Sequence, residues 1–459
     1  MIDTEPLPFI KAYLDSLQDS LASSHRLSKC QRYWIGFCLM GILMTNTIAW
    51  AKFERISLKK YTKQALSKMF RWAKVDWSKL LEASTKMILK KYGITHGTLV
   101  IDDKDHARSK NAEKLHGLHK IKDKKTGGYI LGQNIVLLYL VTEKFCIPVS
   151  FTFYTPDPAL KAWCEEDKKL KKQGIPKKDR PKEPKRSENY PKKYEIALKL
   201  LKNFAEKVSE IRISCVLADA LYGNGLFIDE IEKIWKGVQV ITQIRSNQKI
   251  RFRNKDISCK KYFTSYQGWN HTISIRGQSP VKVVAGGARV LVCSQGKKRF
   301  VIALKYEGET EYRYLIASNL TWNMKEIIQS YTLRWYIEVF FEDWSGYCGF
   351  CSMAKQCGVE GSERPLILSL LFDHCFLFHF RQQLFIENKL PLATLGSLVE
   401  KSRFDGLCQF IKNIIHSEDP KQQIRHLEEM SDLIFPCKTS KKHLSGLNGQ
   451  MDSHKKNAA

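Results

Sequence analysis

The segment from Tyr331 to Ser345, YTLRWYIEVFFEDWS, carries side chains whose types and spacing suit phosphate chemistry. Tyr331, Arg334 and Glu338 are three and four residues apart, so a helix would place a phenol, a guanidinium and a carboxylate on one face. A carboxylate oxygen is a ligand for hard metal ions, and the other two groups hydrogen-bond to phosphate oxygens. The segment therefore predicts a helix face that binds a metal ion beside a phosphate.

Two further carboxylates follow strand-like segments upstream. Asp103 ends TLVIDD and Asp219 ends RISCVLAD, whereas Asp102 points to the opposite face of its strand from Asp103. A single Asp at a strand end is more often a turn or helix-cap residue, so the prediction depends on all three acids together. Three such carboxylates suit two Mg²⁺ ions about 4 Å apart, which activate an attacking oxygen and stabilise a leaving one. Mn²⁺ is expected to substitute.

The composition indicates a globular protein with a polyanionic partner. The chain has 459 residues, 43% of them hydrophobic, and 75 Lys+Arg against 47 Asp+Glu give a net charge of +28. An excess of this size favours nucleic acid first and an anionic membrane second. The alternative is a soluble basic protein whose lysines are simply solvated.

The apolar segments favour a buried core over a membrane span. Residues 33–50 hold no charge over 18 residues, which is at the short limit for a span, and Thr45, Asn46 and Thr47 lie within them. We therefore expect a core helix there and no membrane partner. The chain has 13 cysteines, an odd number, and no secretory leader, so we expect free thiols and a bacterial-type cytoplasmic location. When bound to DNA, the protein is expected to be associated with the nucleoid. Cys348 and Cys351 form a CxxC without the second pair that a zinc site needs.

Periodicity divides the chain into helical and strand-rich parts. The predicted regions are a helical, candidate DNA-end-binding region at 1–95; a strand–helix core at 96–245 with an exposed basic loop at 168–193; a β-rich insertion at 246–320; core completion with the Glu338 helix at 321–380; C-terminal, candidate dimerisation helices at 381–435; and a disordered tail at 436–459. Asn323 and Glu326 predict a capping box that opens the Glu338 helix.

Three segments resemble those of DDE insertion-sequence transposases, in the branch marked by a Tyr–Arg–Glu–Lys signature. They are IDD at 101–103, LADALYGNG at 217–225 and YTLRWYIEVFFEDW at 331–344, and GGYILGQNIVLLYLV at 127–141 resembles the second strand of the family. The resemblance implies an α/β fold: a ribonuclease H-like mixed sheet with flanking helices, a β-rich insertion before the last catalytic helix, and an all-α N-terminal region. It also implies two divalent metal ions.

Carried over residue by residue, the resemblance makes Asp103, Asp219 and Glu338 the catalytic and metal-binding acids. Asp103 takes precedence over Asp102 because the first acid of the family is the last residue of its strand. Tyr331 and Arg334 would contact DNA phosphate near the cleaved end. The implied activity is cut-and-paste DNA transposition with a hairpin intermediate. The implied substrates are the double-stranded DNA of the transposon ends and the target DNA. The resemblance also implies a homodimer in the synaptic complex.

Two positions depart from the signature of this branch. Ser345 occupies the position of the signature Lys, and Lys104 follows the first acid where the family often has Thr. Lys355 is a candidate replacement for the missing charge. The departure at Ser345 leaves open a second interpretation, a catalytically impaired transposase relic that binds DNA. A third interpretation is a ribonuclease H-like nuclease that cleaves without joining.

Overall fold

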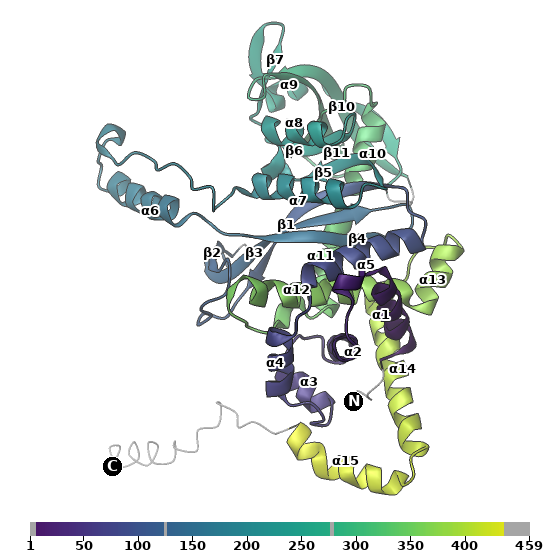
Figure 1. Ribbon diagram of the computed structural model, residues 1–459. Coiled ribbons are helices and arrows are strands. Elements are labelled where there is room, and N and C mark those ends of the chain that lie inside the picture. The colour runs from purple at the N-terminus through teal and green to yellow at the C-terminus, as the bar shows by residue number, and fades with distance from the viewer. Residues whose placement is uncertain (1–5, 124–125, 276–279, 436–459) are drawn as a thin grey trace, which may run out of the picture.

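The computed structural model describes residues 6–123, 126–275 and 280–435 and is organised around one mixed sheet (Figure 1). Its five central strands lie in the order β4-β3-β1-β5-β6, with antiparallel pairing from β4 to β1 and parallel pairing from β1 to β6. This is the arrangement of a ribonuclease H-like core, so the predicted fold class is confirmed. The strands are β1 (His96–Ala107), β3 (Tyr129–Val141), β4 (Cys146–Tyr154), β5 (Arg212–Ala218) and β6 (Gln239–Ile244).

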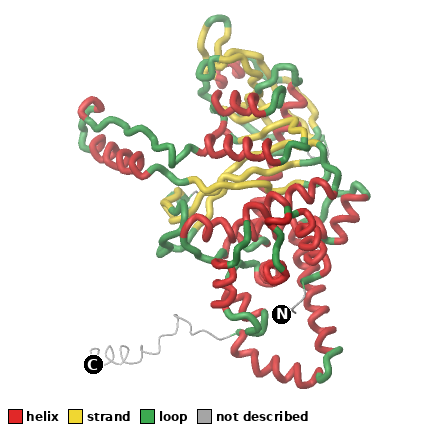
Figure 2. The backbone as a smooth tube through the Cα atoms, in the orientation of Figure 1, coloured by secondary structure: helices red, strands yellow, loops and turns green. Residues whose placement is uncertain are grey.

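Helices cover both faces of this sheet, as Figure 2 shows. On one face α7 (Lys193–Lys207) packs on β3 and β4, and α8 (Gly225–Ile234) packs on α7 and β6. On the other face α11 (Trp335–Tyr347) contacts β1, while α5 (Trp77–Lys91) and α12 (Gly358–Cys375) contact β4. Because both faces are covered, β3 is a nearly continuous apolar run that is buried from Gly132 to Val141.

The β-rich region extends the same sheet outward from β6. β12 (Arg313–Ala317) pairs antiparallel with β6, and β11 (Lys297–Tyr306) and β10 (Val281–Val292) follow it. The remaining elements are β7 (Lys249–Phe252), β8 (Lys255–Ser258), α9 (Cys259–Ser265) and β9 (Trp269–Ile273). Strands were expected where β9, β10, β11 and β12 lie, whereas β7, β8 and α9 were not expected. A short strand β2 (His119–Lys122), also unexpected, pairs with β3 at the opposite edge.

The N-terminal helices share the hydrophobic core of the molecule. Trp34 to Leu43 of α2 are buried, and the hydroxyl of Tyr13 lies 2.8 Å from that of Ser84, which lies 2.8 Å from His374 Nδ1 of α12. No helix in the described part of the chain is both long and apolar enough to span a membrane. The helices before α5 are α1 (Pro8–Ser20), α2 (Lys29–Thr45), α3 (Trp50–Ile56) and α4 (Lys63–Trp72). A DNA-end-binding role for them stays a prediction.

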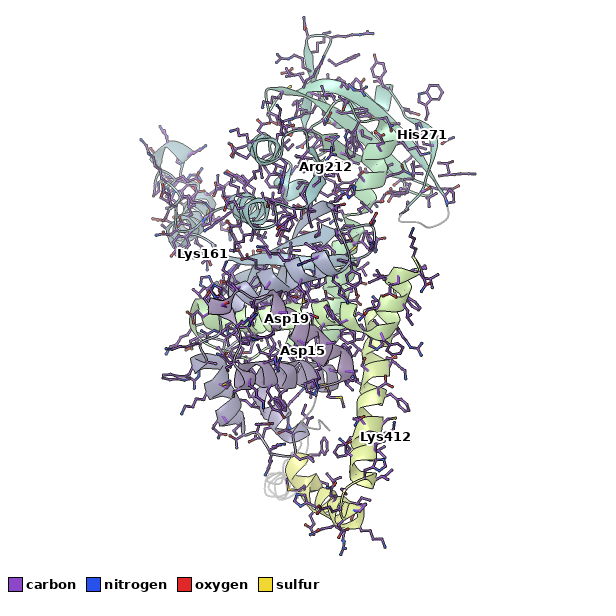
Figure 3. All side chains as sticks on the ribbon, turned by 45° about the vertical axis from the view of Figure 1, so that its right-hand side comes forward. Asp15, Asp19, Lys161, Arg212, His271 and Lys412 are labelled. Atoms are coloured by element: carbon purple, nitrogen blue, oxygen red, sulfur yellow. The ribbon has the colours of Figure 1, made fainter. Side chains whose placement is uncertain are left out.

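Three helices complete the described chain. Figure 3 shows α14, which carries Lys412, standing along one side of the molecule. The helices are α13 (Phe380–Glu387), α14 (Leu395–Ile415) and α15 (Pro420–Ile434). The predicted tail at 436–459 lies outside the described residues. Twelve cysteines within the described ranges are free thiols, as predicted.

The predicted basic loop is structured in part. Residues 168–172 form the end of α6 (Pro158–Lys172), and Lys193 begins α7, so the segment without regular structure is shorter than 168–193. The sequence analysis missed α6 because its apolar residues are few and none of them is buried. In Figure 1, α6 projects from the sheet with a returning chain beside it.

Candidate active site

The first two candidate acids lie where the parallel pairing of the central strands stops. β5 ends at Ala218, which is paired with Ile101 of β1, so Asp219 follows directly beside Asp102. The expectation that the strand ends at Asp103 was wrong, because β1 continues to Ala107 through its antiparallel pairing with β3. The two strands therefore place Asp103 and Asp219 at one edge, as in other sites built at the carboxyl ends of parallel strands.

The alternation of side chains along β1 sends its two aspartates to opposite faces of the sheet. Asp103 Oδ2 accepts hydrogen bonds from Lys193 Nζ of α7 at 2.8 Å and from Asn134 Nδ2 of β3 at 2.7 Å. Asp102 Oδ2 instead lies 2.9 Å from Arg334 Nη1. Lys193 was not predicted, although it stands at the end of the basic run that the sequence analysis singled out.

The sequence predicts that Tyr331, Arg334 and Glu338 lie on one continuous helix, and this prediction is wrong. The capping box is confirmed, since Asn323 and Glu326 exchange backbone-to-side-chain hydrogen bonds of 2.9 Å at the start of α10 (Met324–Thr332). The chain then tightens into backbone bonds between residues three apart, and α11 begins at Trp335. In a turn of this kind, residues three apart eclipse one another. The guanidinium of Arg334 accordingly lies 6.0 Å from the centre of the Tyr331 ring.

Arg334 joins the strand to the helix at the site. Its guanidinium forms an ion pair with Asp102 through Nη1 and a second with Glu338 through Nη2. The Arg334 side chain is 17% exposed and that of Glu338 is 35% exposed, so the pair borders on solvent. The guanidinium of Arg334 thus lies between Asp102 of β1 and Glu338 of α11. Its fork of N–H donors is suited to bridging two carboxylates.

Asp219 has a structural role as well as its place at the site. Its Oδ1 accepts a 2.8 Å hydrogen bond from the backbone N–H of Leu221 and so caps the short helix Ala220–Tyr222. The cap interpretation of this residue is therefore correct, and it does not conflict with metal binding because a carboxylate has a second oxygen.

Burial and neighbouring charges raise the pKa of two acids at this edge. Burial, helped by the charges of Asp219 and Asp103 and opposed by Arg334, raises the pKa of Asp102 to about 7. Burial also raises the pKa of Asp219, and the Asp103 charge adds to the shift. Carboxylates crowded in this way repel one another, and a cation between them would relieve the repulsion.

The donor chemistry of this edge fits a divalent cation, although the acids are held apart in the structure. Carboxylate oxygens are the ligands that Mg²⁺ and Mn²⁺ prefer. In the described residues no three His, Cys, Asp or Glu side chains are grouped closely enough to hold one ion. Lys193 and Arg334 neutralise Asp103, Asp102 and Glu338 instead. Ion binding would therefore require these two side chains to turn away.

The structure places Ser345, the candidate replacement Lys355 and Lys104 in different surroundings. The hydroxyl of Ser345 donates to the Phe341 carbonyl of its own helix at 2.7 Å, and Lys355 Nζ donates to Ser109 Oγ at 2.7 Å on the surface. Lys104 instead extends to α11, where its ammonium lies 5.2 Å from the centre of the Phe341 ring. Burial lowers the pKa of Lys104, while Glu342 and Asp102 are among the neighbours that raise it. Lys104 thus places a cation against the helix that carries Glu338.

Solved structures that are similar to this chain include the following two. A piggyBac transposase in a synaptic complex with hairpin DNA is 10% identical, with a TM-score of 0.42, and the match covers 95% of this chain and 84% of that one. The NurA nuclease from Sulfolobus solfataricus is 9% identical, with a TM-score of 0.25, covering 56% and 80%. No curated protein sequence matches.

The sequence itself matches a protein family over residues 17–268, more than half of the chain. The matched residues include Asp103 and Asp219 and end before Glu338. The family is described as DDE superfamily endonuclease, and endonucleases of this superfamily generally use divalent metal ions. This chain belongs to the DDE superfamily endonuclease family.

Proposed function

We propose that the chain is a DNA transposase that cleaves at the ends of a mobile element and joins the freed ends to target DNA. The observation that carries the proposal is an edge of a ribonuclease H-like sheet at which Asp219 follows beside Asp102, Arg334 bridges Asp102 and Glu338, and Asp103 is the next residue of β1. The family membership supports the endonuclease step. The net charge of +28 fits a DNA substrate.

In this proposal Asp103, Asp219 and Glu338 hold two Mg²⁺ ions, and Mn²⁺ substitutes. When bound, the ions supply Lewis-acid activation of the attacking oxygen and stabilise charge on the leaving oxygen. Arg334 turns from Asp102 and Glu338 to a DNA phosphate, which it holds bidentately, and Tyr331 lies beside it. Lys193 leaves Asp103 in the same rearrangement.

Two in-line displacements complete the proposed excision. Water attacks the phosphorus at the element's end, a P–O bond to water forms, and the bond to the 3′ oxygen breaks to give a 3′-OH. This 3′-OH then attacks the opposite strand, forming a hairpin and releasing the other 3′ oxygen. Incubating a labelled duplex that contains the end with Mg²⁺, Mn²⁺ or EDTA tests the scheme. Nicked and then hairpin products are expected only with metal, and products that form equally in EDTA would refute it.

A DNA-binding relic without catalysis is the second candidate, and one observation favours it. Ser345 supplies no charge at the signature position, and its hydroxyl is bonded to its own helix. Binding of the end without any cleavage in either metal would support this candidate over the first.

Lys104 is expected to supply the phosphate-binding charge that Ser345 lacks. Replacing Lys104 with Gln should weaken binding to the element's end and reduce the slope of log affinity against log salt by about one, because one phosphate contact is lost. Fluorescence anisotropy across a KCl series would measure this. Lys355→Gln is the matched control and is expected to leave the slope within error. Equal slopes for native protein and Lys104→Gln would contradict the assignment.

A homodimer is expected to form through an exposed apolar face of α14. Phe404, Leu407, Ile411 and Ile415 are 60%, 43%, 46% and 61% exposed and lie at spacings of three and four residues. A face of this kind can pair with a second copy about a two-fold axis, and two DNA ends call for two active sites. Light scattering should give a dimer for the native protein and a monomer for Ile411→Glu. A native monomer, free and bound to DNA ends, would rule the interface out.

A further inference from the structure

The segment from Asp157 to Tyr190 forms an arm that projects from the core (Figure 1). It comprises α6, a turn at Gly174 with a positive φ of 79°, and a returning chain from Ile175. Figure 3 labels Lys161 on this arm. No residue of α6 is buried, so the arm adds no apolar surface to the core. A long excursion of this kind is more typical of a binding element than of a connection.

The base of the arm is fastened by one buried carboxylate. Asp157 is 3% exposed, and its Oδ1 caps α6 by accepting from the N–H of Ala159 at 2.9 Å and of Leu160 at 3.4 Å. Its Oδ2 accepts from the N–H of Ser187 on the returning chain at 2.9 Å. These hydrogen bonds, that from Ser187 foremost, lower the pKa of Asp157. One side chain thus holds both ends of the arm together.

The two halves of the arm are also joined along its length. Trp163 Nε1 donates to the carbonyl of Pro181 at 2.8 Å, and Arg180 Nη1 pairs with Asp167 Oδ1 at 2.7 Å. The prolines of the returning chain restrict its backbone to extended conformations. The arm is therefore held in shape before any partner binds, which lowers the entropy lost on binding.

The exposed surface of the arm carries more lysines than acids. The exposed lysines are Lys161, Lys168, Lys169, Lys171, Lys172, Lys177, Lys178, Lys182 and Lys185. Asp157 and Asp167 are used inside the arm. Five exposed acids offset part of the lysine charge and leave an excess of four cations; they are Glu165, Glu166, Asp179, Glu183 and Glu188. The 15-residue helix is about 22 Å long. A strand of duplex DNA presents a phosphate about every 3.4 Å, so the helix spans about six of them.

The arm begins and ends beside the acids of the active site. β4, which precedes it, ends at Tyr154, and α7, which follows it, begins at Lys193. Lys193 Nζ lies 2.8 Å from Asp103 Oδ2 and 5.4 Å from the centre of the Tyr154 ring. DNA held at Asp103 would therefore leave the site next to the base of the arm.

We propose that this arm is a clamp that lies along the phosphate backbone of the DNA duplex flanking the cleaved bond. The proposal rests on the proposed function for the identity of the substrate. Lysines without a fixed partner bind phosphates as point charges, so the contact is independent of base sequence. The clamp would position the duplex, while the acids act on one phosphate of it.

The test compares two triple variants that remove equal charge. Lys168, Lys169 and Lys172 of the arm are changed to Gln in one, and the exposed Lys389, Lys412 and Lys421 of the C-terminal helices are changed to Gln in the other. Binding to a labelled 40-base-pair duplex carrying the element's end is measured in EDTA over a KCl series. Because no cleavage is needed, a failure of the catalytic proposal would not affect this result.

The arm variant is expected to lose about two to three units of salt slope, and the control variant less than one. Hydroxyl-radical footprinting should show protection lost over about six base pairs on one side of the cleavage point. Equal slopes for the arm and control variants would overturn the proposal. Unchanged DNA binding combined with lost binding to phosphatidylserine vesicles would overturn it in favour of a membrane surface.

Discussion

Replacing Asp103 with Asn is expected to lower the rate of DNA cleavage about 10³-fold, because several kcal/mol of metal-dependent stabilisation are lost and each 1.36 kcal/mol is tenfold. Asp219→Asn should have an effect of the same size. The fold should persist, since Asn keeps the shape of the side chain and can still accept the Leu221 N–H bond at position 219. Single-turnover cleavage of a labelled end would measure the rates.

Asp102→Asn is the matched control for this prediction. Asp102 binds Arg334 and so positions Glu338 from the other face of β1, which makes it a supporting residue. Changes to such supporting residues typically cost 10–100-fold. A larger loss for Asp102→Asn than for Asp103→Asn would contradict the assignment and make Asp102 the metal ligand.

Replacing Arg334 with Met is expected to impair both stability and cleavage. Asp102, whose side chain is 16% exposed, and Glu338 would lose their shared cation. Removing one partner of a buried ion pair typically lowers the free energy of unfolding by about 3–5 kcal/mol. Because this pair is partly exposed to solvent, we expect a loss of about 2 kcal/mol. Urea denaturation would measure this loss. Cleavage should fall about 10²-fold or more because a bidentate phosphate contact is also lost.

Arg334→Lys separates the charge of this residue from its geometry. Lysine restores a cation but cannot bridge two carboxylates in a fixed plane. We therefore expect stability to recover partly and cleavage to remain low. The double variant Asp102→Asn with Arg334→Met should be less destabilised than the sum of the single changes, since the two residues share one interaction. Full recovery of cleavage with Lys would contradict the bridging role.

Most of the strands and the capping box could be predicted because their signals are local. The β-branched run of β4 and the Asn323–Glu326 pair contain all the information that their backbone needs. The break between α10 and α11 could not be predicted, because no Pro or Gly marks it and both flanking segments favour helix. The end of β1 was misplaced because its continuation depends on pairing with β3, a partner distant in sequence.

The acids of the site could be named from their order and setting, but their partners could not. Lys193 and Asn134 reach Asp103 from α7 and β3, and nothing in the local sequence of either residue indicates this. The arm was seen only as a basic run. Its shape depends on contacts such as Trp163 with Pro181, which form only once the chain has turned back at Gly174.

The most direct test of the central claim is cleavage of a supercoiled plasmid that carries the element's own ends, with Mg²⁺ or Mn²⁺, by native protein and by Glu338→Gln. The account predicts linear or nicked product cut at the ends by the native protein, and none by the variant, although both bind the DNA. Equal cleavage by both proteins would remove Glu338 from the site. Tight binding without cleavage by either protein would identify a DNA-binding relic, and the absence of binding would contradict the account as a whole.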